Sequence, residues 1–126
     1  MTKQEVDTFE KLQAQLEGLH TEISALSKKS QNDALNKFKL KFVNQILSGA
    51  NQLLGESYKP FTDFSLFDND EMPTNSDVAM ILTQYLSCFE KLRADNVKQE
   101  RIYWYWIIDG SQSDIKTVMP KKIKEK

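Results

Sequence analysis

Residues 9–26, FEKLQAQLEGLHTEISAL, hold the pattern that decides how this chain folds. Apolar side chains recur there in alternating steps of three and four residues, which is a heptad repeat on an α-helix. The a and d positions of the repeat, which we call the seam, are Phe9, Leu12, Leu16, Leu19, Ile23 and Leu26. A stripe this narrow suits one partner helix better than a broad globular core. The sequence therefore predicts a helix that pairs with another helix along the seam.

Charge does not specify the pairing partner of the seam. The flanking e and g positions carry only two charges at neutral pH, so parallel, antiparallel and intramolecular pairing all stay open. Gly18 costs the helix about 1 kcal/mol relative to Ala, and three heptads are marginal in isolation. We therefore expect the seam to be an oligomer interface, with a second copy of the chain as its partner in a homodimer.

The size and composition of the chain limit its class. With 126 residues it is expected to hold an N-terminal coiled-coil helix at 1–30 and a helical domain at 31–126. A net charge of −1 gives no global reason to expect nucleic acid, and no apolar run is long enough for a membrane span. The polar, acidic beginning of the sequence argues against a secretory signal. The single cysteine, Cys88, fits a reducing compartment, so we expect a cytoplasmic protein.

Two further helices are expected after the seam. Residues 33–54 carry an apolar stripe at helical spacing that includes Phe38 and Phe42, although residues 37–42 also alternate as a strand would. Residues 74–96 carry a broader stripe, which is typical of the core helix of a domain. The connection between these helices is long, aromatic and acidic. We expect it to be ordered, with its rings covering the helix ends.

The C-terminal part of the chain has a different composition. Residues 101–108, RIYWYWII, are dense in β-branched and aromatic side chains and predict a strand. Asp109 and Gly110 favour a turn, after which residues 115–119 can return antiparallel. The predicted fold class is therefore mainly α, as an α+β fold. It comprises the N-terminal heptad helix, two further helices in a small bundle and a C-terminal β-hairpin.

The period of a strand divides residues 101–108 into two faces. The wholly apolar face, assigned to the core against the third helix, holds Ile102, Trp104, Trp106 and Ile108. The other face mixes rings with charge, as contact surfaces do, and its candidates for binding a partner are Arg101, Tyr103 and Tyr105. The alternative is that these tyrosines pack on the rings of the preceding loop, which are Phe61, Phe64 and Phe67.

The sequence contains no pattern that predicts an enzyme. A Cys88–His20 pair could form a thiolate–imidazole dyad, but a core cysteine and a surface histidine explain these residues better. One histidine and one cysteine do not suit a zinc site, and the acidic loop lacks the glycine of an EF-hand. The glycines are isolated, so no phosphate-binding loop is expected. We expect no metal, no cofactor and no catalytic residue.

The sequence favours a protein-interaction module, such as a small accessory subunit, adaptor or inhibitor, that binds an unidentified protein and itself. The alternative is a nucleic-acid-binding protein, in which lysines contact phosphates and the aromatic strand stacks bases. The lysines of this alternative are Lys28, Lys29, Lys37, Lys39 and Lys41, together with the C-terminal lysine tail. Protein binding is preferred because the chain has only two arginines and because its acidic loop would repel a nucleic-acid backbone.

Overall fold

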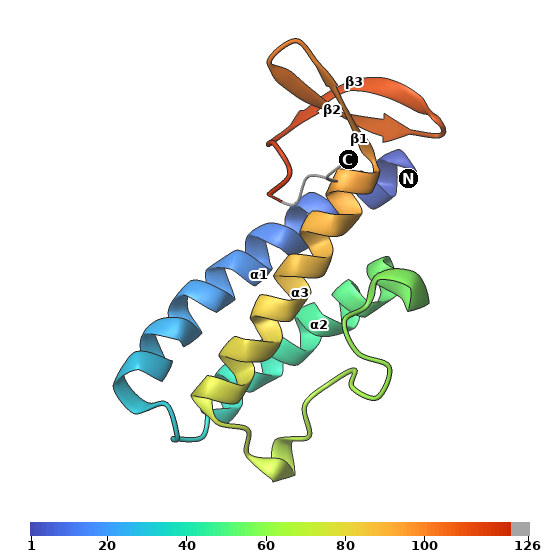
Figure 1. Ribbon diagram of the computed structural model, residues 1–126. Helices are drawn as coiled ribbons and strands as arrows, with labels where there is room; N and C mark the ends of the chain where they lie inside the picture. Colours follow the sequence, from blue (N-terminus) through green and yellow to red (C-terminus); the bar gives the residue numbers. More distant parts are fainter. Residues whose placement is uncertain (122–126) are drawn as a thin grey trace.

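Three helices and a small sheet make up the computed structural model, which describes residues 1–121. The elements are α1 (Lys3–Ser30), α2 (Lys37–Tyr58), the short 3₁₀ helix η1 (Asn69–Glu71), α3 (Asn75–Asp95), β1 (Val97–Glu100), β2 (Tyr103–Ile108) and β3 (Ser111–Thr117). The helices lie side by side, and the sheet stands at the end of the bundle that holds the N-terminus (Figure 1). The predicted fold class, mainly helical α+β, is confirmed. Within the described residues, no helix combines the length and the apolar character that crossing a bilayer requires.

Helix α1 begins at a capping box, which satisfies backbone groups that the first turn leaves unpaired. The Thr2 hydroxyl accepts a hydrogen bond from the Glu5 amide at 3.1 Å, and the Glu5 carboxylate accepts one from the Thr2 amide at 2.8 Å. The helix ends at Ser30. Its core side chains belong to one cluster with those of α2 and α3.

The seam lies inside the single chain. Phe9 and Leu16 are 0% exposed and Ile23 is 1% exposed, while Leu12 retains 8%. Leu19 and Leu26 are partly buried and pack against the same core. The expectation of a seam presented to another chain is therefore corrected, because steps of three and four also suit a helix in the groove between two neighbours of its own chain. A homodimer stays a prediction, but the seam offers it little surface.

Helix α2 buries a different face from the one that the sequence suggested. Its buried apolar side chains are Leu40, Val43, Leu47, Ala50 and Leu54. Phe38 and Phe42 instead point outward, 71% and 38% exposed. Residues 37–42 are helical, so the strand alternative is excluded there. The element reaches Tyr58 across a kink at Gly55, whose φ of +64° is not helical but is a conformation that glycine adopts at little cost.

The connection between α2 and α3 is ordered, as expected. Phe61, Phe64 and Phe67 pack against the core, and consecutive rings meet edge-on with centroids 6.2 and 5.0 Å apart. The Asn44 side chain holds Phe67 by both backbone groups, each at 3.0 Å. Asn51 donates to the carbonyl of Ser65 at 2.8 Å. The rings therefore lie along α2, where these two asparagines fix the loop.

The predicted hairpin is part of a three-stranded antiparallel sheet in the order β1-β2-β3. Arg101, at φ +59°, and Ile102 form the turn between β1 and β2, so Ile102 is 79% exposed and its assignment to the core was wrong. Trp106 is 0% exposed and Ile108 packs against the core, which confirms the apolar face at these positions. Trp104 is half-buried.

Truncation of a seam residue should destabilise the folded monomer. We expect Leu16→Ala to lower the free energy of unfolding by about 2–5 kcal/mol, because Leu16 is fully buried. Leu66→Ala is the control, since Leu66 is 46% exposed, and its effect should stay below about 0.5 kcal/mol. Urea denaturation at several low protein concentrations measures both. If the urea midpoint of wild type rises with protein concentration and Leu16→Ala is a folded monomer, the seam lies between chains instead.

Candidate binding surfaces

A groove opens between the α2–α3 loop and the N-terminal half of α3. Its volume is about 680 Å³, and it is lined by residues 63–68 and 71–74 of the loop and by side chains of the first two turns of α3. Leu66, Met72 and Met80 expose 46%, 60% and 52% of their surface there. Methionine side chains adapt their shape to a ligand, and clustered exposed apolar side chains are typical of binding surfaces. We call this feature the groove.

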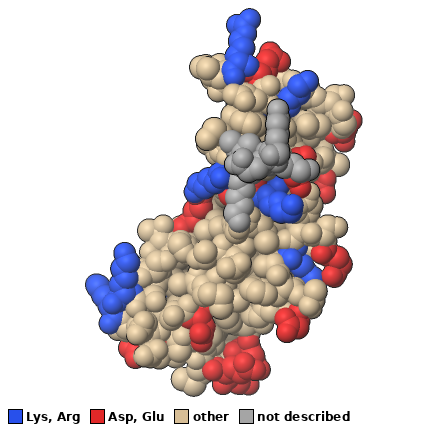
Figure 2. All heavy atoms as spheres, in the orientation of Figure 1, with Lys and Arg blue, Asp and Glu red and all other residues tan. Residues whose placement is uncertain are grey.

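The charge in the groove has one sign. Four exposed acidic side chains line it, namely Asp63, Asp68, Glu71 and Asp77. Among the described residues of its lining, none is a lysine or an arginine. Figure 2 shows a cluster of acidic side chains at the lower end of the molecule, where Figure 1 places η1, and further acidic side chains over the rest of the visible face. The groove therefore combines an apolar floor with a negative field.

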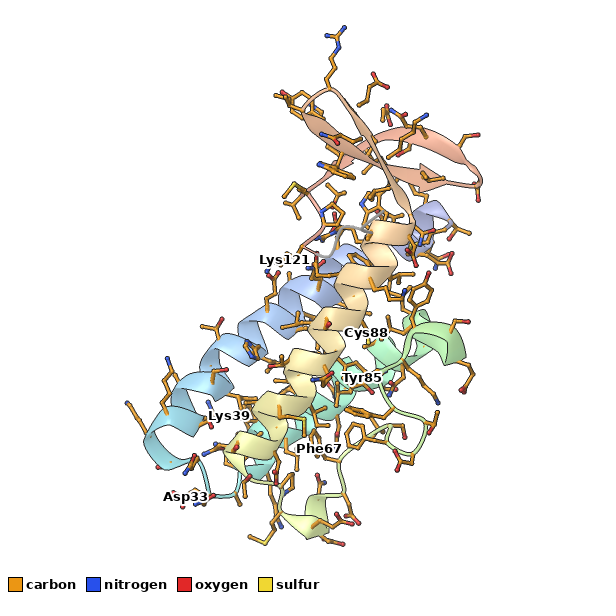
Figure 3. The ribbon with its side chains drawn as sticks, in the orientation of Figure 1. Asp33, Lys39, Phe67, Tyr85, Cys88 and Lys121 are labelled. Carbon is orange, nitrogen blue, oxygen red and sulfur yellow. The ribbon has the colours of Figure 1, made fainter. Side chains whose placement is uncertain are left out.

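Polar side chains beneath the loop hold the groove in shape. The Tyr85 hydroxyl on α3 donates to the Asn51 side chain on α2 at 2.5 Å, and Asn51 in turn holds Ser65. Burial raises the pKa of Tyr85, so this hydroxyl keeps its proton. Figure 3 shows Phe67 and Tyr85 on the side of α3 that faces the loop. Helix and loop are thus joined by hydrogen bonds that a disordered loop would not make.

A second surface lies on the N-terminal half of α2. The rings of Phe38 and Phe42 meet edge-on with centroids 5.0 Å apart, although both are exposed. Exposed Lys37 and Lys41 flank them, and the Lys41 ammonium lies 5.6 Å from the Phe42 centroid. We call these four residues the ridge. Sequence reasoning missed it, because the spacing of the two phenylalanines is the same as that of buried residues on a helix.

The five lysines proposed to bind nucleic acid lie on two helices, α1 and α2. Lys28 and Lys29 are exposed in the last turn of α1. Lys39 is half-buried and pairs with Glu22, whereas Lys37 and Lys41 belong to the ridge. Figure 3 shows Lys39 at the opposite end of the bundle from the sheet, so the basic segment and the aromatic strand do not meet. Residues 122–126 of the lysine tail lie outside the described residues.

The three predicted partner-binding residues lie together at the free end of the sheet. Arg101 is exposed in the β1–β2 turn, Tyr103 is 45% exposed and Tyr105 is half-buried. The two tyrosine rings are 6.4 Å apart, and the Lys116 ammonium lies 3.8 Å from the Tyr103 centroid. The ring contacts of Phe64 are with the other loop phenylalanines. The structure thus gathers these candidates on a face that is separate from the loop rings.

A buried charged network, which sequence reasoning missed, joins the bundle to the sheet. Arg93 is 3% exposed and contacts Glu90 at 3.0 Å and Glu10 at 3.3 Å. Gln13 hydrogen-bonds to both Arg93 and Glu90. Glu10 also accepts a hydrogen bond from the Trp106 indole at 3.4 Å. The available signal was Glu90 and Arg93, three residues apart on a core helix.

His20 and Cys88 lie on adjacent helices. The His20 ring is 2.9 Å from the Thr83 hydroxyl, and Cys88 is half-buried five residues further along α3. Among residues 1–121, no three histidine, cysteine or acidic side chains gather so that they could hold a metal ion.

At the C-terminal end of α2, the Tyr58 hydroxyl donates a hydrogen bond to Asp95 at 2.6 Å, and this bond raises the pKa of Tyr58 to about 12. This contact stabilises the fold fully below pH 10 and is lost as the pH rises through 12.

Comparison of the chain with protein-family models, with curated proteins and with solved structures found no match. A function must therefore be argued from the surfaces themselves. Two of them, the groove and the ridge, expose large apolar side chains beside charge of a single sign. The sheet end adds exposed tyrosine beside lysine and arginine.

Removal of Arg93 should destabilise the protein strongly. Arg93→Met leaves Glu90 buried without its cation, which costs about 3–5 kcal/mol. The matched control is Arg101→Met, because Arg101 is exposed in a turn, and its effect should be below about 0.5 kcal/mol. The double variant Arg93→Met with Glu90→Gln, which also removes the charge of Glu90, should recover part of the lost stability. Equal unfolding midpoints for the two arginine variants would show that the network contributes nothing to stability.

Proposed function

We propose that this protein is a non-enzymatic protein-interaction module, of the kind that serves as a small accessory subunit, adaptor or inhibitor, and that its main binding surface is the groove. One observation carries the proposal. Exposed methionine and leucine side chains share a single groove with four carboxylates, and its described lining holds no basic side chain. The cytoplasmic location predicted from Cys88 is part of the same proposal.

The composition of the groove defines the chemistry of its partner. A complementary segment carries lysines or arginines on its polar side and large apolar side chains on the other, as a basic amphipathic helix does. Burial of each apolar anchor contributes up to about 1.5–3 kcal/mol. The carboxylates accelerate association and exclude acidic partners, and this part of the interaction weakens as salt is added.

The sheet end supplies a second proposed contact. Arg101, Tyr103 and Tyr105 keep their role as candidates for partner binding, since aromatic and arginine side chains are enriched in interfaces. Their place at the opposite end of the bundle from η1 means that a partner reaching both surfaces would have to follow the length of the bundle (Figure 1). The groove and the sheet end can therefore be tested separately.

Nucleic-acid binding is the alternative proposal. The position of Lys116 over the Tyr103 ring favours it, because aromatic and cationic side chains together bind single strands. The carboxylates of the groove and the distance between the aromatic sheet and the basic segment weigh against it. A labelled single-stranded oligonucleotide is therefore the comparator in the binding experiment.

Truncation of Met80 should weaken binding of a basic amphipathic peptide. The probe is a fluorescein-labelled helical peptide of about 16 residues with lysines on one face and leucines on the other. Met80→Ser should raise its Kd about 10-fold, because one apolar anchor site is lost from the groove. Met119→Ser is the matched control, since Met119 lies outside the groove lining and is 58% exposed against 52% for Met80. Fluorescence anisotropy measures both variants.

Two further arms of the titration separate the proposals. A peptide whose lysines are replaced by glutamates should not bind, and added salt should weaken the basic peptide. Equal affinities of Met80→Ser and Met119→Ser for the basic peptide would exclude the groove as its site. Submicromolar binding of the oligonucleotide at physiological salt would favour the nucleic-acid alternative.

A further inference from the structure

The ridge leaves two aromatic rings in solvent, and the binding function of the groove does not use them. Phe38 and Phe42 are four residues apart, so they form one apolar anchor on one face of α2. Lys37 and Lys41 stand beside them. Two apolar anchors at this spacing with lysines at their side are the features of a helix that binds in a groove. They are also the features that the groove of this protein would select.

Ridge and groove match each other in charge and in apolar content. The ridge presents lysines beside aromatic rings, and the groove presents carboxylates beside methionines. Sulfur–aromatic contacts between Met72 or Met80 and the phenylalanine rings would add to the apolar burial. The volume of about 680 Å³ is in the range of ligand-binding pockets in proteins. The two surfaces are thus complementary, although one chain carries both.

The geometry of α2 keeps the two rings of the ridge away from the groove of their own chain. Asn44 binds Phe67, which lines the groove, so the groove lies on the Asn44 side of α2. Successive residues of an α-helix are about 100° apart, which places Phe42 about 160° and Phe38 about 120° from Asn44 around the axis. The same spacing places Lys37 about 20° and Lys41 about 60° from Asn44. The two rings of the ridge therefore face away from the groove of their own chain, whereas its two lysines lie on the groove side of α2.

We infer that the ridge of one copy of this protein occupies the groove of a second copy, so that the chain associates with itself head to tail. This inference rests on the proposed function of the groove and names its partner. The contact is heterologous, so each added copy leaves one groove and one ridge open. Such an interface produces a ring if its rotation closes and a growing chain of copies if it does not.

Two variants that each disable one surface test the inference. The ridge variant is Lys37→Glu with Phe38→Ser, and the groove variant is Glu71→Lys with Met80→Ser. All four side chains are exposed, so both proteins should fold, which circular dichroism checks. The control is Lys98→Glu with Ile102→Ser, which makes the same kinds of change at the exposed end of the sheet.

Analytical ultracentrifugation over a range of protein concentrations at low salt gives the masses. Wild type and control should reach masses above a dimer as concentration rises, while each of the two variants alone should remain monomeric. An equimolar mixture of the two variants should form a 1:1 dimer, twice the monomer mass, and no larger species, because it holds one intact groove and one intact ridge per pair. Salt of about 0.3 M should reduce all association.

Several results would overturn the inference. A wild-type protein that stays monomeric, a mixture that stays monomeric, or variants that associate as strongly as wild type would each do so. A monomeric wild type that still binds the basic peptide would exclude self-association while leaving the proposed function of the groove intact. The ridge variant should bind that peptide as tightly as wild type, since its groove is unchanged.

Discussion

The burial of Phe9 is the interaction on which the rest of the structure depends. Its ring lies 4.9 Å from that of Phe89 on α3 and 5.0 Å from that of Trp106 on β2. The Arg93 guanidinium lies 5.2 Å from the same ring, so the charged network covers the junction between bundle and sheet. An aromatic cluster of this kind stabilises the fold by more than the burial of its apolar area alone. One side chain of α1 thus joins the first helix, the last helix and the sheet.

Because α1 is committed to this core, the surfaces that we propose for association lie on other elements. Backbone hydrogen bonds support those surfaces at the end of the bundle away from the sheet. The Leu35 amide donates to the Pro73 carbonyl, and the Asn75 amide donates to the Asp33 carbonyl, each at 2.9 Å. These contacts fix the start of α2 against the start of α3. The groove and the ridge, which lie beside these two helix starts, are therefore presented by a rigid frame, and a rigid binding site loses less entropy on association.

Helix positions were predictable from the sequence because caps and apolar periods are local, but the partners of each face were not. The seam and the pair Phe38 and Phe42 share the same spacing, yet the seam is buried and the pair is exposed. Periodicity records that two residues share a face and not what covers that face. Strand β1 was missed because its sequence, VKQE, lacks the β-branched and aromatic density of β2. The groove could not be predicted, since it exists only where the loop and α3 meet.

We propose that this protein binds through the groove while the seam stays inside the bundle. Hydrogen–deuterium exchange with and without the basic amphipathic peptide tests it most directly, because exchange reports on every segment at once. The account predicts slower exchange in residues 63–81 on peptide binding and unchanged, slow exchange across residues 9–26. Peptide-induced protection or release along residues 9–26, with no change in the groove, would contradict it.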